Sequence, residues 1–373
     1  MCRRKSCFKN PMNPFFASSL STTGNFTRKN VAIAGAPDKQ TVPLRKDAPR
    51  HPMKVLRTLF AIAVSASLAV SARAQQTVLR VGHFPNITHA QGLVASQLSR
   101  EGKGWFEERL GKDVKIEWFV YNAGPSAMEA IAANSIDLTY VGPNPALNLY
   151  VKAEGEEVRV VAGAAIGGAA LVVQADGRVG KPADFKGRAI GTPQLGGTQD
   201  VACRAWLKKQ GFRITQLGGD VNVLPTPNPD QLTLFTTNKL DGVWTVEPWV
   251  SRLELEAKGK IFLEQKEVIT TVLVASVKAL AEKRGLVKQF VAAHRELTEW
   301  MSQNPADAKI IANAALKVIT KKEMPAALID HAWPRITFTT ALPPGGFEAA
   351  VAEAQSVGFI RGRADLSRLV VAP

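Results

Sequence analysis

A segment that occurs twice places the strongest constraint on how this chain can fold. Each copy holds a proline, an asparagine, an aspartate and an aromatic residue at one fixed offset, namely Pro125, Asn134, Asp137 and Tyr140, then Pro229, Asn238, Asp241 and Trp244. Both copies predict a helix that starts at the proline, an asparagine turn, a strand and a proline-containing turn. Chance similarity is the alternative. The repeat therefore indicates two lobes of like topology, each offering an equivalent turn to a shared cleft.

Strand-like and helix-like segments alternate along the chain. Strands are expected at Val78–Gly82, Val114–Val120, Ile136–Val141, Val158–Ala164, Ala170–Gln174 and Arg188–Gly191, and helices at Ala90–Leu110, with a break near Gly102, and at Pro125–Ala133. This alternation predicts an α/β protein in which each lobe is a mostly parallel sheet flanked by helices.

Two apolar segments are expected to connect the lobes. Val158–Gln174, with its Gly167-Gly168 pair, leads from lobe 1 to lobe 2, and Ile269–Ser276 leads back. Two crossings form a hinge that can close around a ligand. The predicted lobe 1 comprises residues 75–165 and 275–373, and the predicted lobe 2 comprises residues 166–274. The helical region from Val277 to Val318 is expected to pack on lobe 1.

The N-terminal region is typical of an export signal. A basic start at Met53–Arg57 precedes an apolar run from Leu59 to Val70 and then Ala72-Arg73-Ala74. This order predicts a signal peptide at 53–74, cleavage after Ala74 and a periplasmic protein. An anchor helix is the alternative, although the run of 12 residues is shorter than the roughly 20 that cross a bilayer. Residues 1–52, basic and polar, are expected to be disordered or a mis-assigned upstream extension, with a real cytoplasmic extension as the alternative.

Most of the positive charge lies in that N-terminal region. Residues 1–74 hold 13 of the 47 Lys and Arg residues and 2 of the 32 Asp and Glu residues, so the rest of the chain carries a net charge of +4. No basic stripe is interleaved with aromatic residues, which argues against nucleic-acid binding. Cys203 is the one cysteine after residue 74, so no disulfide can form within residues 75–373. We expect a buried apolar role for Cys203, with a reactive thiol as the alternative, and a soluble monomer.

Candidate ligand-binding residues were sought directly after strands, because free N–H groups at helix starts favour anions there. Five turns supply them: Asn86, Thr88 and His89; Gly124 and Ser126; Asn144; Gly197, Thr198 and Gln199; and Glu247 and Trp249. Each has a structural alternative. Thr88 is a possible N-cap, Ser126 and Glu129 form the pattern of a capping box, Asn144 lies in a rigid proline turn, residues 192–200 form a Thr-capped loop, and the tryptophans near Glu247 are core residues.

The chain after residue 74 contains none of the common catalytic motifs. HExxH, GxSxG and CxxC are absent, and no carboxylate has metal-site spacing to His83 and His89. The sequence therefore predicts no catalytic residue, no metal and no cofactor.

Several stretches resemble a known family. Ile116–Ile131, Ser135–Leu138, Asp184–Gly191 and the segment from Leu240 to Trp249 are similar to the aliphatic-sulfonate-binding proteins of ABC importers. The larger group includes nitrate- and taurine-binding proteins and relatives that bind thiamine-pyrimidine precursors. The resemblance covers roughly Val78 to Lys260. It implies a two-lobed periplasmic-binding-protein fold (type II), a ligand in the interlobe cleft that contacts the five turns, and a permease in the inner membrane as partner.

These observations favour an aliphatic sulfonate as the ligand, because neutral donors suit an anion that stays ionised at physiological pH. Taurine is a close second, since Glu247 could pair with its ammonium group, and nitrate, a phosphonate or a thiamine-pyrimidine precursor also stay open. An enzyme like the thiamine-pyrimidine synthases, which share the fold, is a remote alternative. A sensor that docks on a receptor is another.

Overall fold

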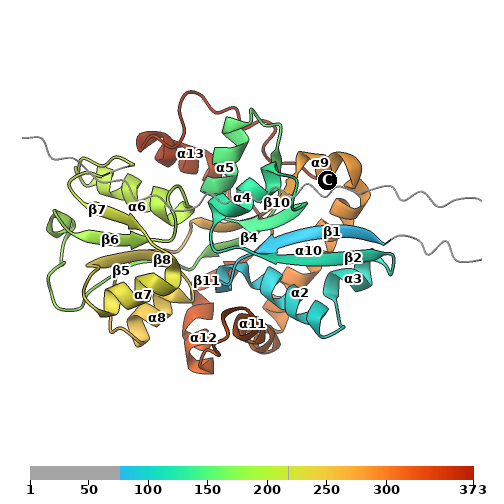
Figure 1. Ribbon diagram of the computed structural model, residues 1–373, viewed down its shortest axis with the longest axis horizontal. Coiled ribbons are helices and arrows are strands. Elements are labelled where there is room, and N and C mark those ends of the chain that lie inside the picture. The colour runs from blue at the N-terminus through green and yellow to red at the C-terminus, as the bar shows by residue number, and fades with distance from the viewer. Residues whose placement is uncertain (1–75, 217) are drawn as a thin grey trace, which may run out of the picture. The chain divides into compact units, whose positions relative to one another are not determined.

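The computed structural model describes residues 76–216 and 218–373, and the predicted extension 1–52 and signal peptide 53–74 lie outside them. Two β-sheets, each with helices on both faces, make up this part of the chain (Figure 1). Among the described residues, none of the helices combines the length and apolar character that a bilayer crossing requires.

The first sheet has six strands in the order β11-β4-β10-β3-β1-β2. β1 runs parallel to β2 and β3, whereas β10 is antiparallel to β3 and β4, and β11 is antiparallel to β4. The bounds are β1 (Thr77–His83), β2 (Val114–Val120), β3 (Leu138–Val141), β4 (Val158–Gly167), β10 (Ile269–Ser276) and β11 (Ile336–Phe338).

The second sheet has five strands in the order β7-β6-β8-β5-β9. β6 runs parallel to β7 and β8, and β5 is antiparallel to β8 and β9. The bounds are β5 (Ala169–Val173), β6 (Ala189–Thr192), β7 (Asn222–Pro225), β8 (Gly242–Val246) and β9 (Lys260–Gln265).

Both sheets are mixed, so the prediction of mostly parallel sheets was wrong. Apart from the pair of β11 with β4, the antiparallel pairs all involve β5 or β10, which begin at the crossings between the sheets. β1, β3, β6 and β8 instead end near those crossings and lead into helices. A strand that begins at the crossing necessarily runs opposite to strands that end there.

The chain crosses between the sheets twice. The first crossing is at Gly167 and Gly168, whose φ angles of 77° and 70° favour glycine, and the second lies between β9 and β10. The predicted boundary at 274–275 falls inside β10, which pairs with β3 and β4 of the first sheet. The chain therefore returns to the first lobe before Ile269, earlier than the predicted boundary.

Helices cover both faces of each sheet. Around the first sheet they are η1 (Ile87–His89), α2 (Ala90–Arg100), α3 (Trp105–Leu110), α4 (Gly124–Ala132), α5 (Pro143–Lys152), α9 (Val277–Glu282), α10 (Arg284–Gln303) and α11 (Pro305–Thr320). Around the second they are η2 (Pro182–Phe185), α6 (Thr198–Lys209), α7 (Asn228–Thr236) and α8 (Trp249–Leu255). The chain ends with α12 (Ala326–Ala332), η3 (Trp333–Arg335) and α13 (Gly346–Ser356).

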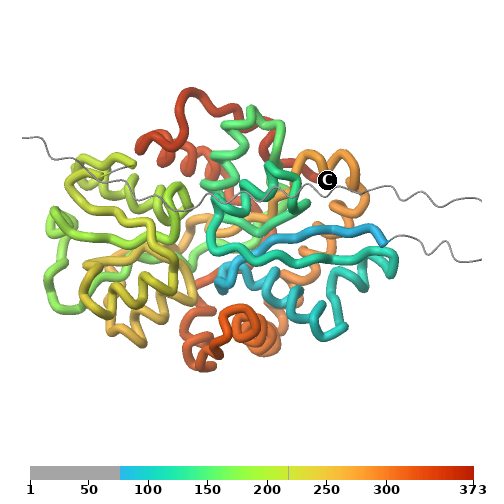
Figure 2. The backbone as a smooth tube through the Cα atoms, viewed as in Figure 1, coloured from blue at the N-terminus to red at the C-terminus, as the bar shows by residue number. Residues whose placement is uncertain are grey.

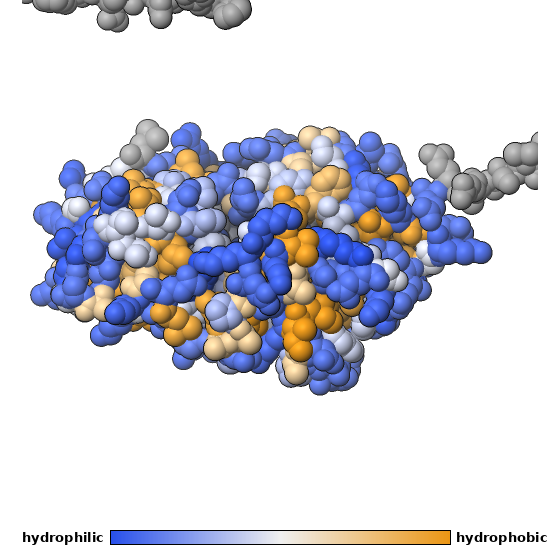
Figure 3. Space-filling model, turned by 60° about the horizontal axis from the view of Figure 1, so that its bottom comes forward, coloured by the Kyte–Doolittle hydropathy of each residue, from blue (hydrophilic) through white to orange (hydrophobic). Residues whose placement is uncertain are grey.

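The helices after β10 fall into two groups. α10 and α11 pack on α3 and α2, as expected for helices that cover the first sheet. α12 packs against α8, and α13 packs against both α5 and α6, so these later helices touch elements of both sheets (Figure 2). The face turned forward in Figure 3 is mainly hydrophilic, with apolar residues in separate patches.

The sequence repeat corresponds to a structural repeat. Pro125 and Pro229 lie in the first turns of α4 and α7, and both helices are followed by an asparagine with positive φ, 54° at Asn134 and 58° at Asn238. The aspartate that comes next accepts a backbone hydrogen bond from the neighbouring strand in each sheet, Arg80 N to Asp137 Oδ2 at 2.8 Å and Ala189 N to Asp241 Oδ2 at 3.0 Å. The two lobes therefore share a β-α-β unit that ends at the crossings.

Candidate ligand-binding site

A small cavity of about 30 Å³ lies where the two sheets face each other. Both lobes contribute to its wall. The lining residues are Phe84, Asn86, Thr88, His89, Asn122, Ala123, Gly124, Gly142, Pro145 and Thr270 from the first, and Pro193, Gln194, Gly197, Thr198, Gln199, Asn228 and Val246 from the second. One water molecule needs about 10–15 Å³ of such volume, so the cavity has room for a small polar group only.

Helix starts from both lobes meet at this cavity. Gly124 begins α4 and Gly142 precedes α5, while Thr198 begins α6 and Asn228 begins α7. None of these starts is capped by a side chain. Their first N–H groups and the positive ends of the helix dipoles favour a negative group.

Glycine at two of these starts permits the close approach of neighbouring groups. A Cβ atom on Gly124 would overlap the ring of Pro145, and a Cβ atom on Gly142 would overlap the Thr198 hydroxyl oxygen in the other lobe. The backbone N of Asn144 lies 3.4 Å from that same Thr198 Oγ1. The starts of α5 and α6 are therefore in direct contact across the cleft.

Of the residues that the structure describes, no Asp, Glu, Lys or Arg lines the cavity. His89 is buried there and stacks on Phe84, with ring centroids 4.3 Å apart. Burial, with a smaller effect from His83, holds the pKa of His89 well below its usual value, so the ring is neutral at pH 7. Its Nδ1 atom has no hydrogen-bond partner among the described residues. A buried polar atom of this kind costs about 1–3 kcal/mol, which a ligand acceptor or donor would recover.

Two buried asparagines are oriented with their amide nitrogens available. Asn86 Oδ1 accepts a hydrogen bond from Trp249 Nε1 at 3.0 Å, and Asn228 Oδ1 accepts one from Thr245 Oγ1 at 3.1 Å. Since the oxygens are engaged as acceptors, the NH₂ groups of these two cavity-lining residues are left as donors. The wall thus offers neutral hydrogen-bond donors from both lobes.

A buried ion pair holds the start of α6 in place. Asp200 accepts hydrogen bonds from Thr192 Oγ1 at 2.8 Å, from Gly196 N at 3.0 Å and from Arg204 Nε at 3.0 Å. The Arg204 guanidinium also donates to the backbone oxygens of Thr215 and Val223. Because both charges are paired and hydrogen-bonded, they fix the loop from Thr192 to Gly197 without placing a charge in the cavity.

Of the residues predicted from sequence, the structure brings seven to the cavity wall: Asn86, Thr88, His89, Gly124, Gly197, Thr198 and Gln199. Four others do not line it, namely Ser126, Asn144, Glu247 and Trp249.

Ser126 and Asn144 lie within the first turns of α4 and α5. The expected capping box at Ser126 is wrong, because α4 begins two residues earlier, at Gly124, and the Ser126 hydroxyl donates to Ala123 O at 2.8 Å. Asn144 is buried, with its side-chain nitrogen 3.5 Å from Ala350 O in α13. Both side chains are thus engaged inside the first lobe.

Glu247 and Trp249 lie at the contact between the lobes. The Glu247 carboxylate is fully buried, accepts hydrogen bonds from Ser251 N and Oγ at 3.0 Å each, and lies 3.4 Å from Arg335 Nη1. Trp249 donates to Asn86 instead of pointing into the cavity. The carboxylate is therefore engaged within the protein and is not free to pair with a ligand ammonium group.

Sequence reasoning missed several wall residues, and the repeat could have located some of them. At the offset that relates Pro125 to Pro229, Gly124 corresponds to Asn228 and Gly142 corresponds to Val246, and all four line the cavity. Thr270 comes from β10, for which no turn signal exists. Across the described ranges 76–216 and 218–373, no three His, Cys, Asp or Glu residues gather as a metal site would require.

Two mixed sheets, joined by two crossings and enclosing a polar cavity, define the two-lobed periplasmic-binding-protein fold. The alkanesulfonate-binding protein SsuA from Xanthomonas axonopodis pv. citri, bound to MOPS, superposes with a TM-score of 0.64 at 18% identity and covers 80% of this chain and 100% of that chain. The nitrate-binding protein NrtA from Synechocystis PCC 6803 superposes with a TM-score of 0.62 at 14% identity. The match covers 76% of this chain and 82% of that chain. At these identities the likeness establishes the fold.

The sequence model of the NMT1-like family matches residues 72–316, and the chain belongs to this family. A protein of Brucella abortus (strain 2308), named only as a binding protein, is 27% identical over 271 residues, which cover 70% of this chain and 79% of that protein. An aliphatic sulfonates-binding protein named in Bacillus subtilis (strain 168) is 34% identical over 58 residues, or 15% of this chain and 17% of that protein. The fold and family expected from the sequence resemblance are thereby confirmed.

Proposed function

We propose that this protein is the solute-binding component of an ABC importer and captures an aliphatic sulfonate or a related organic oxyanion between its lobes. The observation that carries this proposal is an uncharged polar cavity lined by helix starts of both lobes and by His89, whose buried Nδ1 has no hydrogen-bond partner in the described part of the chain. The names of the relatives point the same way, because they include sulfonate-, nitrate- and other binding proteins.

The rest of the proposal follows from this role. The protein works in the periplasm after export by a cleaved signal peptide at 53–74, acts as a monomer and delivers its ligand to a permease in the inner membrane. It uses no cofactor and catalyses no reaction.

A sulfonate suits this cavity for an electrostatic reason. The anion keeps its charge at any physiological pH, so it needs donors rather than a proton acceptor. Backbone N–H groups at helix starts, amide nitrogens and hydroxyl groups supply such donors without the desolvation of a buried lysine or arginine. A head group held from both lobes stabilises the closed arrangement over an open one, because only the closed form makes all of the contacts.

A sulfonate head group is larger than this cavity, so the lobes must separate for ligand entry and then close on the ligand somewhat further apart than they lie in this structure. Near the cavity the lobes are joined by a few hydrogen bonds, including Ile87 N to Glu247 O at 3.0 Å and Trp249 Nε1 to Asn86 Oδ1 at 3.0 Å. The two crossings at Gly168 and before Ile269 leave a hinge about which such a separation can occur.

Titration of the purified protein with methanesulfonate, taurine, nitrate and methylphosphonate tests the proposal. We expect a sulfonate to raise the melting temperature, with about 2.7 kcal/mol of stabilisation at a concentration of 100 Kd. Asn228→Asp should weaken sulfonate binding by more than tenfold, because it places a negative charge at the cavity, and should keep the fold because aspartate is accepted at a helix start.

Asn222→Asp is the matched control, since Asn222 is an exposed residue of β7 outside the cavity, and it should leave binding unchanged. If none of the four anions produces a thermal shift or a heat of binding, the oxyanion proposal fails.

A further inference from the structure

We propose that a larger pocket beside the cavity is a second compartment of the same site, and that it receives an uncharged tail of the ligand. The protein would then bind an organic monoanion with a tail of several carbon atoms, in preference to nitrate or taurine. This inference rests on the proposed function, because it assumes that an anionic head group occupies the cavity.

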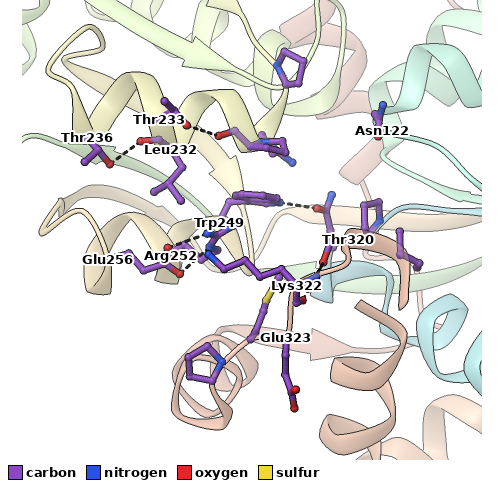
Figure 4. A pocket seen from close by; sticks show the side chains of 18 of the residues that line it. Asn122, Leu232, Thr233, Thr236, Trp249, Arg252, Glu256, Thr320, Lys322 and Glu323 are labelled. Carbon is purple, nitrogen blue, oxygen red and sulfur yellow. Dashed lines mark hydrogen bonds and ion pairs between the residues drawn. The ribbon is translucent and has the colours of Figure 1, made fainter. Parts of the chain in front are cut away.

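The second compartment has a volume of about 750 Å³. It lies between α7 and α8 on one side and the segment that joins α11 to α12 on the other (Figure 4). Leu232, Trp249, Ile319 and Met324 are among the apolar residues that line it. A pocket of several hundred cubic ångströms with apolar walls is typical of sites that hold an organic molecule.

The two spaces adjoin each other at three asparagines. Asn86, Asn122 and Asn228 each line both the cavity and the larger pocket. Asn86 and Asn228 are the residues whose amide nitrogens are left as donors. A ligand whose head group contacts these amides from the cavity would extend its substituent past them into the larger pocket.

The charges of the larger pocket indicate that the tail is neutral. Glu256 is paired with Arg252 at 2.8 Å, and Glu323 is paired with Lys317 at 2.6 Å. The guanidinium of Arg252 also lies 4.8 Å from the ring centroid of Trp249. Both carboxylates of the lining are therefore engaged, as is Glu247 nearby, and none is left for an ammonium group such as that of taurine.

Lys322 is the remaining charged residue of the lining, and no ion pair involves it within the described part of the chain. Lys322 is exposed, so its ammonium group can stay hydrated at the rim of the pocket. The interior of the compartment thus presents apolar side chains together with the threonine hydroxyls of α7.

Calorimetric titration with methane-, butane- and octanesulfonate, and with taurine beside ethanesulfonate, tests the inference. Each methylene that enters the compartment should strengthen binding roughly fourfold, so affinity should rise steeply from methane- to octanesulfonate. Ethanesulfonate should bind more tightly than taurine, which adds only the ammonium group.

Thr233→Trp provides a structural test, because Thr233 is an exposed residue of α7 on the wall and a tryptophan there would fill the compartment. We expect octanesulfonate to lose at least tenfold in affinity and methanesulfonate to lose much less. Lys239→Trp is the control, since Lys239 is exposed and outside both spaces.

Equal affinities along the sulfonate series, a taurine affinity above that of ethanesulfonate, or a Thr233→Trp protein with unchanged chain-length dependence would each overturn the inference while leaving the proposed function intact. Absence of binding by every sulfonate would instead defeat the proposed function itself.

Discussion

Two titratable residues, His89 and Glu247, show how burial sets the charge near the interlobe contact. Burial lowers the pKa of the imidazole and raises that of the carboxyl group, so both shifts favour the neutral form. For Glu247, hydrogen bonds from Ser251 and the nearby Arg335 oppose the shift, but desolvation is the larger effect and the pKa is raised to about 7. Attraction for an anion is therefore left to oriented N–H groups instead of fixed positive side chains.

Glu247 makes the stability depend on pH with a definite sign. Its pKa in the folded protein, about 7, lies above the ordinary value of 4.5, so the folded state binds the proton more tightly between these values. The free energy of unfolding should then fall as the pH rises from about 4.5 to 7, by a few kcal/mol at most. Glu247→Gln should remove this decline, as urea unfolding at pH 5 and pH 8 would show.

Glu256 provides the comparison. A hydrogen bond from Arg252 lowers the pKa of Glu256, so its stabilising effect is present at neutral pH and is lost as the pH falls. Glu256→Gln should therefore cost stability at pH 8 rather than at low pH, the opposite trend. Parallel curves for wild type and Glu247→Gln would contradict the assignment of the pH dependence to Glu247.

At the scale of elements, the repeated β-α-β unit explains why several helix starts reach one cavity. β1 and β3 in the first sheet, and β6 and β8 in the second, run parallel and end near the crossings. The helices that follow them begin at the same edge, and the carboxyl ends of two sheets face each other there. The cavity is thus a consequence of topology, and its polar wall follows from which residues begin the helices.

Gly142 is a position where a larger side chain should prevent the two lobes from closing. Gly142→Ala should disfavour the closed form, since the new Cβ would overlap the Thr198 hydroxyl of α6, and ligand affinity should fall at least tenfold. The helices themselves should remain folded. Small-angle scattering should report a larger radius of gyration, while circular dichroism should be unchanged.

The control is Gly285→Ala, in α10, where a Cβ atom would meet nothing within 4 Å. This change should raise stability by up to about 1 kcal/mol through helix propensity and leave affinity unchanged. An alanine at Gly142 that binds ligand as tightly as the wild type would mean that the contact between α5 and α6 does not limit closure.

At the scale of the whole described body, the C-terminal elements hold the two sheets together. α12 packs on α8, and Ser251 Oγ of α8 lies 2.9 Å from His331 Nδ1 of α12. Arg335, at the end of η3, lies 2.7 Å from Glu254, 3.4 Å from Glu247 and 3.9 Å from Glu264, all in the second lobe. One guanidinium therefore lies within 4.0 Å of three carboxyl groups of the other lobe.

Arg335→Met should loosen the contact between the lobes, because it removes the cation that lies beside the buried Glu247 and the partly buried Glu254 and Glu264. Removal of one partner from a buried ion pair lowers the free energy of unfolding by about 3–5 kcal/mol. Because Arg335, Glu254 and Glu264 are partly exposed to solvent, we expect a decrease at the lower end of that range or below it. Hydrogen exchange should become faster in α8 and α12 and stay unchanged in α3 and α10. Unaltered exchange in α8 would show that packing of α12 alone holds the contact.

Much of the site was accessible from sequence because it depends on local signals. A turn after a strand, with glycine or a hydroxyl residue at the helix start, located Gly124, Gly197 and Thr198 correctly on the wall. Glu247 had the same kind of signal, yet its carboxylate turns toward Ser251 and Arg335. The direction of a side chain depends on distant partners, and Arg335 lies 88 residues further along the chain.

The sequence by itself determined much of the local structure: the positions of most strands, the helices that carry Pro125 and Pro229 in their first turns, and the asparagine turns that follow them. These features follow from propensity and spacing over a few residues. Only the tertiary structure decided that β10 joins the first sheet, that α12 and α13 bridge to the second, and that Asn86, Asn122 and Asn228 stand between a small cavity and a large pocket. These features depend on contacts between residues far apart in the chain, for which no short pattern exists.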